Sequence, residues 1–414
     1  MSASIKSNNL ERIKRKNLLA ISFTKLFHGF GANIFNIIYQ KVLLDLTDSL
    51  VLIGMIISIG SIMQFLPMPF IGKLSDRYNR KILITSSMPV FMMGVFLFMI
   101  ASPSTIYYAI LGILIYFLGF TINNLNSQFI VSESSNKSKG LIYGFMFFSF
   151  FLGSIGGSTL VITLGPNIDP KMYFLIYIGV LAIEGIIYGT LLSNKTQIKK
   201  SISLINKDKK EVNLWIKIFR TKTLRSILIF FTLDLFVYGI TLSIYNAVLY
   251  EFYHLTIENV AVLSIGMNLT NMLFQIPAGR ITDKLGNKKT LILSQFFGLG
   301  FFTMNIMTIF LWVNGFTSTL LITLLIGHIS FAFSIVSFIP AEQVILTDLD
   351  KERKAEYYGI INFIRGVGYI PTGYIAALMV ENIGYLSPFI FSFFGVLIEI
   401  IFLLRFFHHH SNDI

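Results

Sequence analysis

The chain has 414 residues, of which 54% are hydrophobic and only 13% are charged. A soluble domain carries about a quarter charged residues, so this composition excludes a water-soluble fold and indicates a protein that lies in lipid. The net charge of +12 does not indicate a nucleic-acid partner, because the basic residues lie in short connections between apolar runs. The absence of cysteine excludes disulfides, thiolate metal sites and cysteine nucleophiles.

Twelve apolar runs are long enough to cross a bilayer, which takes roughly 20 residues. Lipid cannot satisfy free backbone groups, and no run alternates as a barrel strand does, so we expect an all-α integral membrane protein. The first run is too long for the core of a signal peptide and is expected to be retained. The predicted spans are 18–44, 49–73, 82–101, 105–131, 140–164, 173–193, 224–250, 257–279, 290–313, 317–346, 355–379 and 385–406.

Basic residues are concentrated in the N-terminal tail and in every second connection, as the positive-inside rule predicts for cytoplasmic segments. We therefore expect a protein of the cell membrane with both termini in the cytoplasm. The residues concerned are Arg12, Lys14, Arg15 and Lys16; Arg77, Arg80 and Lys81; Lys137 and Lys139; Lys284, Lys288 and Lys289; and Lys351, Arg353 and Lys354.

The longest break, 195–223, is polar and rich in lysine. It predicts a cytoplasmic linker between a six-helix bundle at 1–194 and a second at 224–414. A short amphipathic helix at 214–219 lying at the lipid headgroups and an ordinary solvated linker both remain open for this segment.

Polar side chains recur at helical spacing within several spans. Such a stripe is costly against lipid, so it normally faces the bundle interior or water. The candidates for binding a substrate or a coupling proton are Lys25, His28 and Asn36 in span one; Asn123 and Asn126 in span four; Asp234, Tyr238, Thr241 and Tyr245 in span seven; and Arg365 in span eleven. Span ten adds His328, Ser330, Ser334 and Ser337.

Two charged strings stand about half a chain apart, each between two apolar runs. The first contains Gly72, Asp76, Arg77, Asn79, Arg80 and Lys81, and the second contains Gly279, Asp283, Lys284, Gly286, Lys288 and Lys289. Further features also repeat in order, among them Glu184 of span six and Glu399 of span twelve. The repeats predict a duplication into two pseudo-symmetric bundles, a common plan for secondary transporters.

These strings resemble the Gly-x-x-x-Asp-Arg/Lys-x-Gly-Arg/Lys-Arg/Lys motif of the major facilitator superfamily, over essentially the whole chain. Asn79 replaces the second glycine, and we expect it to keep the turn because asparagine tolerates a left-handed backbone. The resemblance implies that Asp76 faces the start of span eleven near Ala355, and Asp283 the start of span five near Gly140. Such contacts at a positive helix end exist only when the cytoplasmic side is closed. The conformational gate thus comprises Gly72, Asp76, Arg77, Arg80, Gly279, Asp283 and Lys284; the alternative is that these charges only anchor loops.

The resemblance also implies that spans one, four, seven and ten line a central cavity. Lys25 and Asp234 occupy near-equivalent positions in the two halves, so they can lie across that cavity. A buried charge persists when it is paired or able to change protonation. We interpret Asp234 as the proton-binding group, tuned by Lys25 and His28; the alternative is a fixed ion pair.

Three further intramembrane charges have structural interpretations. Arg365 is expected to neutralise Glu342, with contact to an anionic substrate as the alternative. Glu184 and Glu399 are expected to hydrogen-bond neighbouring helices outside the cavity. No motif for a membrane enzyme, a cofactor or a metal is present.

The sequence therefore predicts a monomeric secondary transporter that moves a small organic solute by alternating access. Proton-coupled efflux is the first interpretation, and uptake of a sugar or organic anion is the second. Drug and metabolite antiporters of the superfamily often carry an arginine in span four and a Gly-Pro-rich segment in span five. This chain has asparagines and a proline-free Gly153-Ser-Ile-Gly156-Gly157 there, so the resemblance to that branch is incomplete. A channel or sensor on the same fold is the remaining alternative.

Overall fold

The computed structural model describes residues 2–134, 139–165, 168–193, 214–347 and 354–407, and all regular structure in these ranges is helical. The helices are α1 Ser2–Thr47, α2 Leu50–Phe65, α3 Met68–Arg77, α4 Arg80–Ile100, α5 Tyr107–Ser134, α6 Lys139–Leu164, α7 Met172–Leu191, α9 Leu214–Arg220, α10 Lys222–Leu242, α11 Tyr245–Glu251, α12 Ile257–Leu285, α13 Asn287–Val313, α14 Leu320–Thr347, α15 Lys354–Tyr369, α16 Thr372–Ile383 and α17 Ser387–Arg405. Short 3₁₀ turns at Pro103–Thr105 and Thr317–Thr319 precede α5 and α14.

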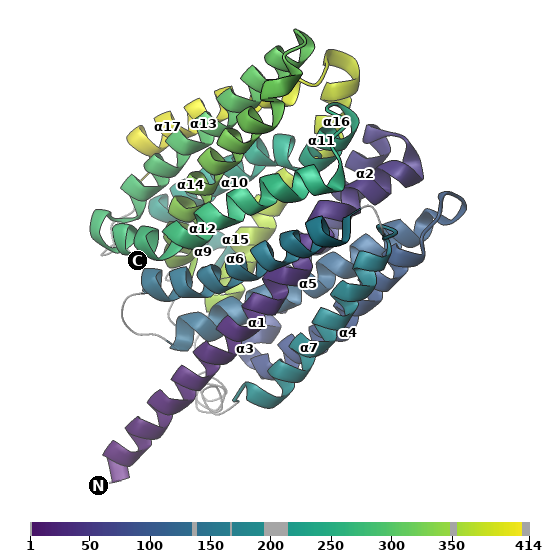
Figure 1. The fold of residues 1–414 in the computed structure, drawn as a ribbon. Coiled ribbons are helices and arrows are strands. Elements are labelled where there is room, and N and C mark those ends of the chain that lie inside the picture. The colour runs from purple at the N-terminus through teal and green to yellow at the C-terminus, as the bar shows by residue number, and fades with distance from the viewer. Residues whose placement is uncertain (1, 135–138, 166–167, 194–213, 348–353, 408–414) are drawn as a thin grey trace.

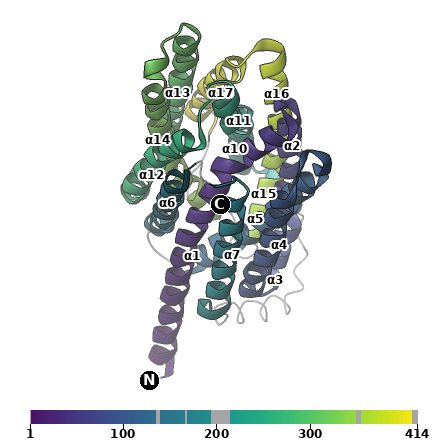
Figure 2. The same cartoon turned by 45° about the vertical axis from the view of Figure 1, so that its right-hand side comes forward.

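Within the described ranges, 12 helical segments are long and apolar enough to cross a membrane, which confirms the predicted number and order. Several continue beyond the apolar run that identifies them. The first spans Glu11–Thr47 rather than 18–44, and α1 projects past the bundle at its N-terminal end (Figures 1 and 2). We call the side of the membrane on which α1 begins the N-terminal side.

Three of the spans are each divided into two helices. Span two breaks at Leu66–Pro67, between α2 and α3, and span eleven breaks at Ile370–Pro371, between α15 and α16. Proline causes both breaks because it lacks the backbone N–H that a continuous helix needs. Span seven breaks between α10 and α11 without a proline, with Ile244 outside the helical region.

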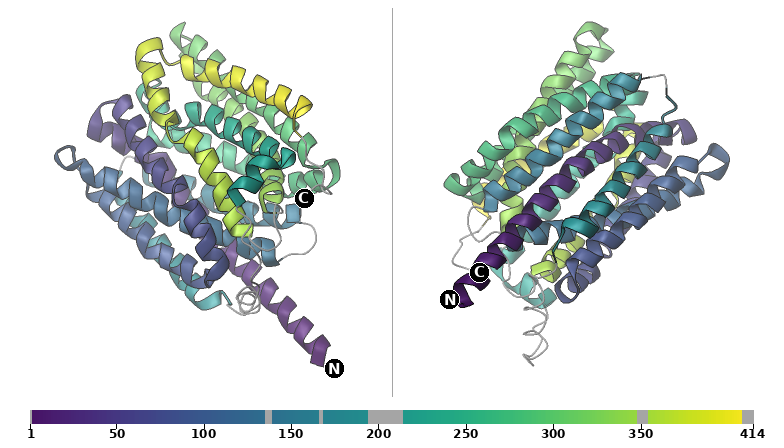
Figure 3. Two further views of the ribbon diagram at one scale, coloured as in Figure 1. Left: turned by 180° about the vertical axis from the view of Figure 1, so that it is seen from behind. Right: turned by 60° about the horizontal axis from the view of Figure 1, so that its bottom comes forward.

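The two halves of the chain lie side by side. In Figure 1 the first half, purple to teal, is at the lower right, and the second half, green to yellow, is at the upper left. Helix α6 packs along α12, and spans two and eleven pack against each other through α3 with α15 and α2 with α16. The rear view in Figure 3 shows the yellow-green span eleven beside the purple span two.

This seam between the halves is tight on both sides of the membrane. A Cβ on Gly54 of α2 would lie 2.3 Å from the carbonyl oxygen of Gly373 in α16. On the N-terminal side, a Cβ on Gly72 of α3 would lie 2.3 Å from the carbonyl oxygen of Ala355 in α15. Backbones at such separations accept only glycine, as in other close helix pairs in lipid.

The predicted linker at 195–223 lies largely outside the described residues. Its described end forms α9, which confirms a short helix at 214–219. Ile218 of α9 is buried, whereas Trp215, Ile216 and Phe219 are exposed. The Trp215 ring packs edge-on against Phe363 of α15, with ring centroids 5.7 Å apart.

Because the backbones of Gly54 and Gly373 are so close, we predict that Gly54→Ala destabilises the packing of α2 against α16. The added methyl overpacks the α2–α16 contact, which costs roughly 1–3 kcal/mol. We expect a lower thermal unfolding midpoint for the purified variant in detergent. The matched control is Gly189→Ala, because a methyl group at position 189 would have no heavy atom within 4 Å and alanine favours a helix. Equal midpoints for the two variants would contradict the packing argument.

Candidate functional site

A cavity of about 240 Å³ lies between the two halves, toward the side opposite the N-terminal side. Both halves contribute to its walls, through α1 from the first and through span seven and α12 to α14 from the second. The lining residues are Asn33, Asn36, Ile37, Tyr39, Gln40, Leu242, Tyr245, Asn246, Val260, Ser264, Met267, Phe301, His328 and Phe331.

The lining contains carboxamides, hydroxyls, an imidazole and apolar rings, and none of its members is Asp, Glu, Lys or Arg. Tyr245 donates to Asn305 Oδ1 at 2.9 Å, and its ring lies 5.5 Å from the ring of His328. His328 Nδ1 lies 2.8 Å from the carbonyl oxygen of Leu324, so Nδ1 carries the hydrogen and Nε2 is the acceptor of a neutral ring. These walls suit an uncharged solute that offers both hydrogen bonds and apolar surface.

Gln40 joins the halves where span seven is broken. Its Nε2 donates to the carbonyl oxygen of Ser243 at 2.7 Å, and its Oε1 accepts from the backbone N–H of Ala247 at 2.7 Å. Both backbone groups lose their helical partners at the break, and lipid cannot supply others. One carboxamide from α1 therefore satisfies a donor and an acceptor of the opposite half and closes this end of the cavity.

Two further contacts reinforce this closure. The side chain of Asn246 donates to the carbonyl oxygen of Asn36 at 2.8 Å, and the hydroxyl of Tyr250 donates to the carbonyl oxygen of Ile37 at 2.7 Å. The α1 backbone thus receives hydrogen bonds from α11 on this side of the membrane.

A second polar junction joins α1, α6 and α12 at the cavity wall. Asn33 donates to Ser158 Oγ at 2.6 Å and accepts from Ser264 Oγ at 2.9 Å. Asn268 donates to the same Asn33 oxygen at 3.3 Å and to Ser264 at 3.0 Å. The carboxamide of Asn33 therefore links three helices from both halves.

Of the predicted binding residues, Asn36 and Tyr245 line this cavity, together with His328 from span ten. Thr241 instead bonds Ser392 at 2.7 Å and the carbonyl oxygen of Pro388, so it holds α10 against α17. Asn126 is fully buried and donates back to the carbonyl oxygen of Ile122 on its own helix. Asn123 is also buried, on the same helix.

Lys25 and His28 lie inside the first bundle rather than at the cavity. His28 Nδ1 is 3.3 Å from Glu184 Oε2, and both side chains are buried. Lys25 is 6% exposed, and Glu184 is also close enough to act on it electrostatically. Glu184 thus lies beside the neighbouring helix α1 and outside the cavity lining, and it faces both of these candidate residues.

Asp234 lies inside the second bundle. Its Oδ1 accepts from Gln295 Nε2 at 2.9 Å, and Gln295 Oε1 accepts from the Tyr238 hydroxyl at 2.9 Å. The structure therefore does not bring Lys25 and Asp234 together, and each has other partners within its own bundle. His28, and not Lys25, has the place in the first bundle that Asp234 has in the second. His28 lies beside Glu184, and Asp234 acts electrostatically on Glu399, the glutamate on the last helix of its own bundle.

Arg365 pairs with Glu342 at 2.6 Å, as predicted. It also donates to Asn362 Oδ1 and to the carbonyl oxygen of Phe231, and its guanidinium lies 4.9 Å from the Phe231 ring centroid. Its donors are thus directed at protein groups, and it does not line the cavity.

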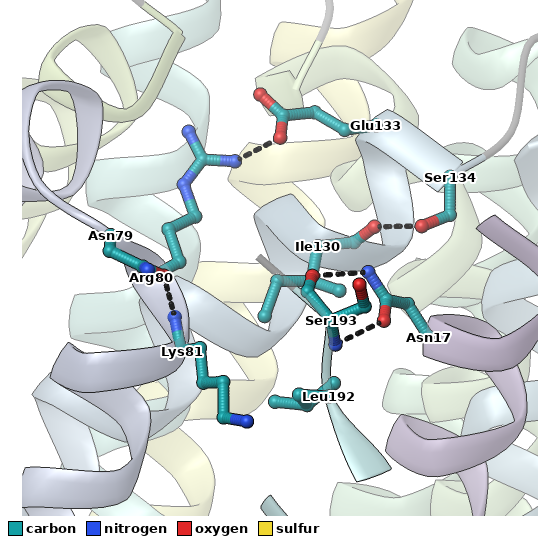
Figure 4. A pocket seen from close by; sticks show the side chains of 9 residues that line it. All are labelled: Asn17, Asn79, Arg80, Lys81, Ile130, Glu133, Ser134, Leu192 and Ser193. Atoms are coloured by element: carbon teal, nitrogen blue, oxygen red, sulfur yellow. Dashed lines mark hydrogen bonds and ion pairs between the residues drawn. The ribbon is translucent and has the colours of Figure 1, made fainter. Parts of the chain in front are cut away.

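The gate motif forms a charge network at the N-terminal side. Asp76 Oδ2 accepts from the backbone N–H of Glu356 at 3.0 Å, which confirms its predicted position at the start of span eleven. Arg80, at the start of α4, contacts Asp76 at 3.2 Å and Glu133 of α5 at 2.7 Å. Figure 4 shows Arg80 directed toward Glu133 beside a small pocket. The network therefore ties three helices of the first bundle to the N-terminus of α15.

The other gate residues are placed as follows. Gly72 and Gly279 are buried, whereas Arg77, Asp283 and Lys284 are exposed. The side chains at 139–141, which Asp283 was expected to approach, lie outside the described residues.

The expectation of a left-handed Asn79 is wrong. Its φ is −69° and its ψ is 114°, and its side chain accepts from the backbone N–H of Lys81 as the N-cap of α4. Asparagine is a preferred N-cap residue for this reason. Gly286, its counterpart in the second half, does have a positive φ of 82°.

Sequence reasoning did not include Gln40, Asn33, Asn246 and Ser264 among the site residues. Gln40 and Asn246 lie near the ends of their spans, where polar residues are ordinary. Asn33 lies off the predicted polar stripe of span one. The sequence signal that could have identified them is a carboxamide within an apolar span, because such a group must find protein partners for both its donor and its acceptor.

Comparison with known proteins agrees with this architecture. The family model of the Major Facilitator Superfamily matches residues 21–293 and again residues 227–413. No curated protein matches the chain. The crystal structure of the human organic anion transporter MFSD10 (TETRAN) superimposes with a TM-score of 0.71 at 14% identity, over 94% of this chain and 99% of that chain. At this identity the likeness concerns the fold. The two family matches together span nearly the whole sequence, and the chain therefore belongs to the Major Facilitator Superfamily of membrane transporters.

Proposed function

We propose that this transporter moves a small uncharged organic solute through the cavity between its halves, with outward transport coupled to inward movement of a proton. The observation that carries the proposal is a cavity that both bundles line with uncharged hydrogen-bonding groups and aromatic rings. A site at the interface of two repeats is where secondary transporters bind their substrates.

Alternating access fits the distribution of contacts between the bundles. On the N-terminal side they meet through Asp76 and the α15 N-terminus. On the opposite side they meet through Gln40 and the broken span seven. Breaking the contacts on one side while keeping those on the other would open the cavity to one side at a time.

Uptake of an uncharged nutrient such as a sugar is the second candidate, because the same amide-rich wall suits hydroxyl groups. The cavity gives less support to an organic anion. No Lys or Arg lines it, and the buried Arg365 is occupied by Glu342. The direction of efflux rests on the incomplete resemblance to drug and metabolite antiporters.

A panel of radiolabelled solutes tests the substrate class in proteoliposomes. We expect saturable counterflow with neutral hydroxylated or amide compounds, and rates at least about tenfold lower with anions of similar size, because an unpaired charge in such a cavity is costly. Asn36→Ala should raise the KM by about two- to tenfold, the value of one hydrogen bond. Asn382→Ala, at an exposed helix end, is the control. Preferred exchange of anions would contradict the proposal, and flux without saturation would indicate a channel.

Proton coupling predicts that Asp234→Asn abolishes accumulation driven by a pH gradient but retains counterflow. The amide keeps the shape and the Gln295 contact but cannot exchange a proton. Asp45→Asn is the control, because Asp45 is an exposed acid at the far end of α1. Solute accumulation and proton movement are measured together in proteoliposomes. Full gradient-driven accumulation by Asp234→Asn would exclude this role for Asp234.

The gate predicts that Asp76→Asn favours opening on the N-terminal side. A carboxylate at a partly buried helix N-terminus is worth roughly 1–2 kcal/mol, so labelling should rise about 5- to 30-fold. The measurement is maleimide labelling of Ile71→Cys, a buried position that packs with Ala355 and Tyr358 across the seam, in this cysteine-free chain. Lys73→Gln on the exposed face of α3 is the control. Equal labelling with aspartate and asparagine at position 76 would mean that the motif only anchors the loop.

A further inference from the structure

The two bundles each hold one glutamate on their last helix, and these residues occupy equivalent places. Glu184 of α7 and Glu399 of α17 are both 0% exposed. In the first bundle, α1 and α7 are antiparallel. The side chain of Asn17 accepts from the backbone N–H of Ser193, and further along α1 the Nδ1 of His28 lies 3.3 Å from Oε2 of Glu184. The glutamate of the first bundle therefore faces a base.

The same register in the second bundle places Glu399 opposite an acid. Helices α10 and α17 are antiparallel, with Thr241 bonded to Ser392 at 2.7 Å and a Cβ on Gly395 meeting Val237 at 2.6 Å. One further turn brings Asp234 level with Glu399. The two carboxyl groups are close enough to interact electrostatically.

Glu399 has no hydrogen bond at either carboxylate oxygen within the described part of the chain. The titratable and polar groups around the two acids are Asp234 and Tyr238 on α10, Gln295 on α13, Glu342 on α14 and Arg365 on α15. Arg365 is the cation among them, and Glu342 already pairs with it at 2.6 Å.

Two buried carboxyl groups without a cation between them are costly to ionise together, because like charges repel strongly where water is absent. The hydrogen-bond chain favours Asp234 as the anion. Tyr238 donates to Gln295, and Gln295 donates through Nε2 to Asp234, so Asp234 is an acceptor, as a carboxylate is. The neutral, protonated partner is then Glu399, which has no donor to stabilise a charge.

We propose that Asp234 and Glu399 form a buried carboxyl–carboxylate pair that holds one exchangeable proton, and that this pair is the proton-binding site of the transporter. Binding forms one O–H bond on a carboxylate oxygen, and release returns the pair to two anions. The pair deepens the proposed proton coupling and rests on it for its role in transport, but its titration can be measured without any substrate.

The position of the pair links it to both the cavity and the seam. The Tyr238 ring stacks on Phe331, a cavity wall residue, with centroids 6.1 Å apart. On the other side, Arg365 lies within electrostatic range of Asp234 and belongs to α15, which packs against α3 of the first bundle. A change from one negative charge to two therefore acts on a helix of the seam as well as on the cavity wall.

The test is infrared titration of the full-length protein in lipid, which detects the C=O band of a buried protonated carboxyl group. Wild-type protein should show one such band that disappears as the pH rises. Glu399→Gln should lose it at neutral pH. Asp234→Asn should keep it but titrate with at least tenfold weaker proton binding, because the repelling neighbour is gone. Glu184→Gln, the equivalent position of the first bundle, should leave this titration unchanged.

A band that persists in Glu399→Gln, or a midpoint that does not move in Asp234→Asn, would overturn the pair. An equal shift in Glu184→Gln would do the same, since it would show a general effect of the fold. Glu399→Met, which replaces the acid by an apolar side chain of similar length, serves if the glutamine variant does not fold. If the pair titrates as described while proteoliposomes show no proton-coupled flux, the proton site stands and only the proposed coupling fails.

Discussion

Within the hydrocarbon layer a polar group has no water to bond, and this constraint shapes the polar contacts between the two halves of the molecule. Gln40 shows it most directly. The break in span seven releases a carbonyl and an N–H, and a single carboxamide from the opposite bundle bonds both. On the other side, Asp76 accepts from the backbone N–H of Glu356 at the start of α15. These contacts between the halves therefore also satisfy backbone groups.

The same constraint separates two kinds of chemistry. The cavity between the halves is lined by uncharged groups, whereas the buried charges lie within the bundles, where neighbouring helices surround them. His28 with Glu184, and Arg365 with Glu342, are paired. A solute can then enter and leave the cavity without breaking an ion pair. In the proposed mechanism, a proton that binds inside a bundle acts on the solute through the packing of helices at the seam.

The pseudo-symmetry of the halves is close in backbone but not in chemistry. The last helix of each bundle presents a buried glutamate at the same level, but one faces a base and the other an acid. A duplicated fold supplies two equivalent places, which hold a histidine–glutamate contact in one bundle and two acids in the other. The N-cap of α4 shows the same divergence, because Asn79 caps a helix where Gly286 has a positive φ.

The sequence by itself determined that the protein lies in lipid, that it has twelve spanning helices and that its two halves are repeats. The length of each hydrophobic run and the repeated charged loops are local properties of the chain, so they can be read without the structure. It also indicated the Asp76 contact and the Arg365–Glu342 pair, since an isolated charge in lipid has few possible partners. Only the tertiary structure decided which polar residues line the cavity. A stripe along one helix predicts a buried face but does not say whether that face meets the other bundle or its own, so Lys25 and Asp234 lie within their bundles while Gln40 and Asn33 lie at the cavity. The prolines at 67 and 371 explain the breaks in spans two and eleven. The break in span seven, and the level at which α10 meets α17, come from packing between distant segments, which no local pattern encodes.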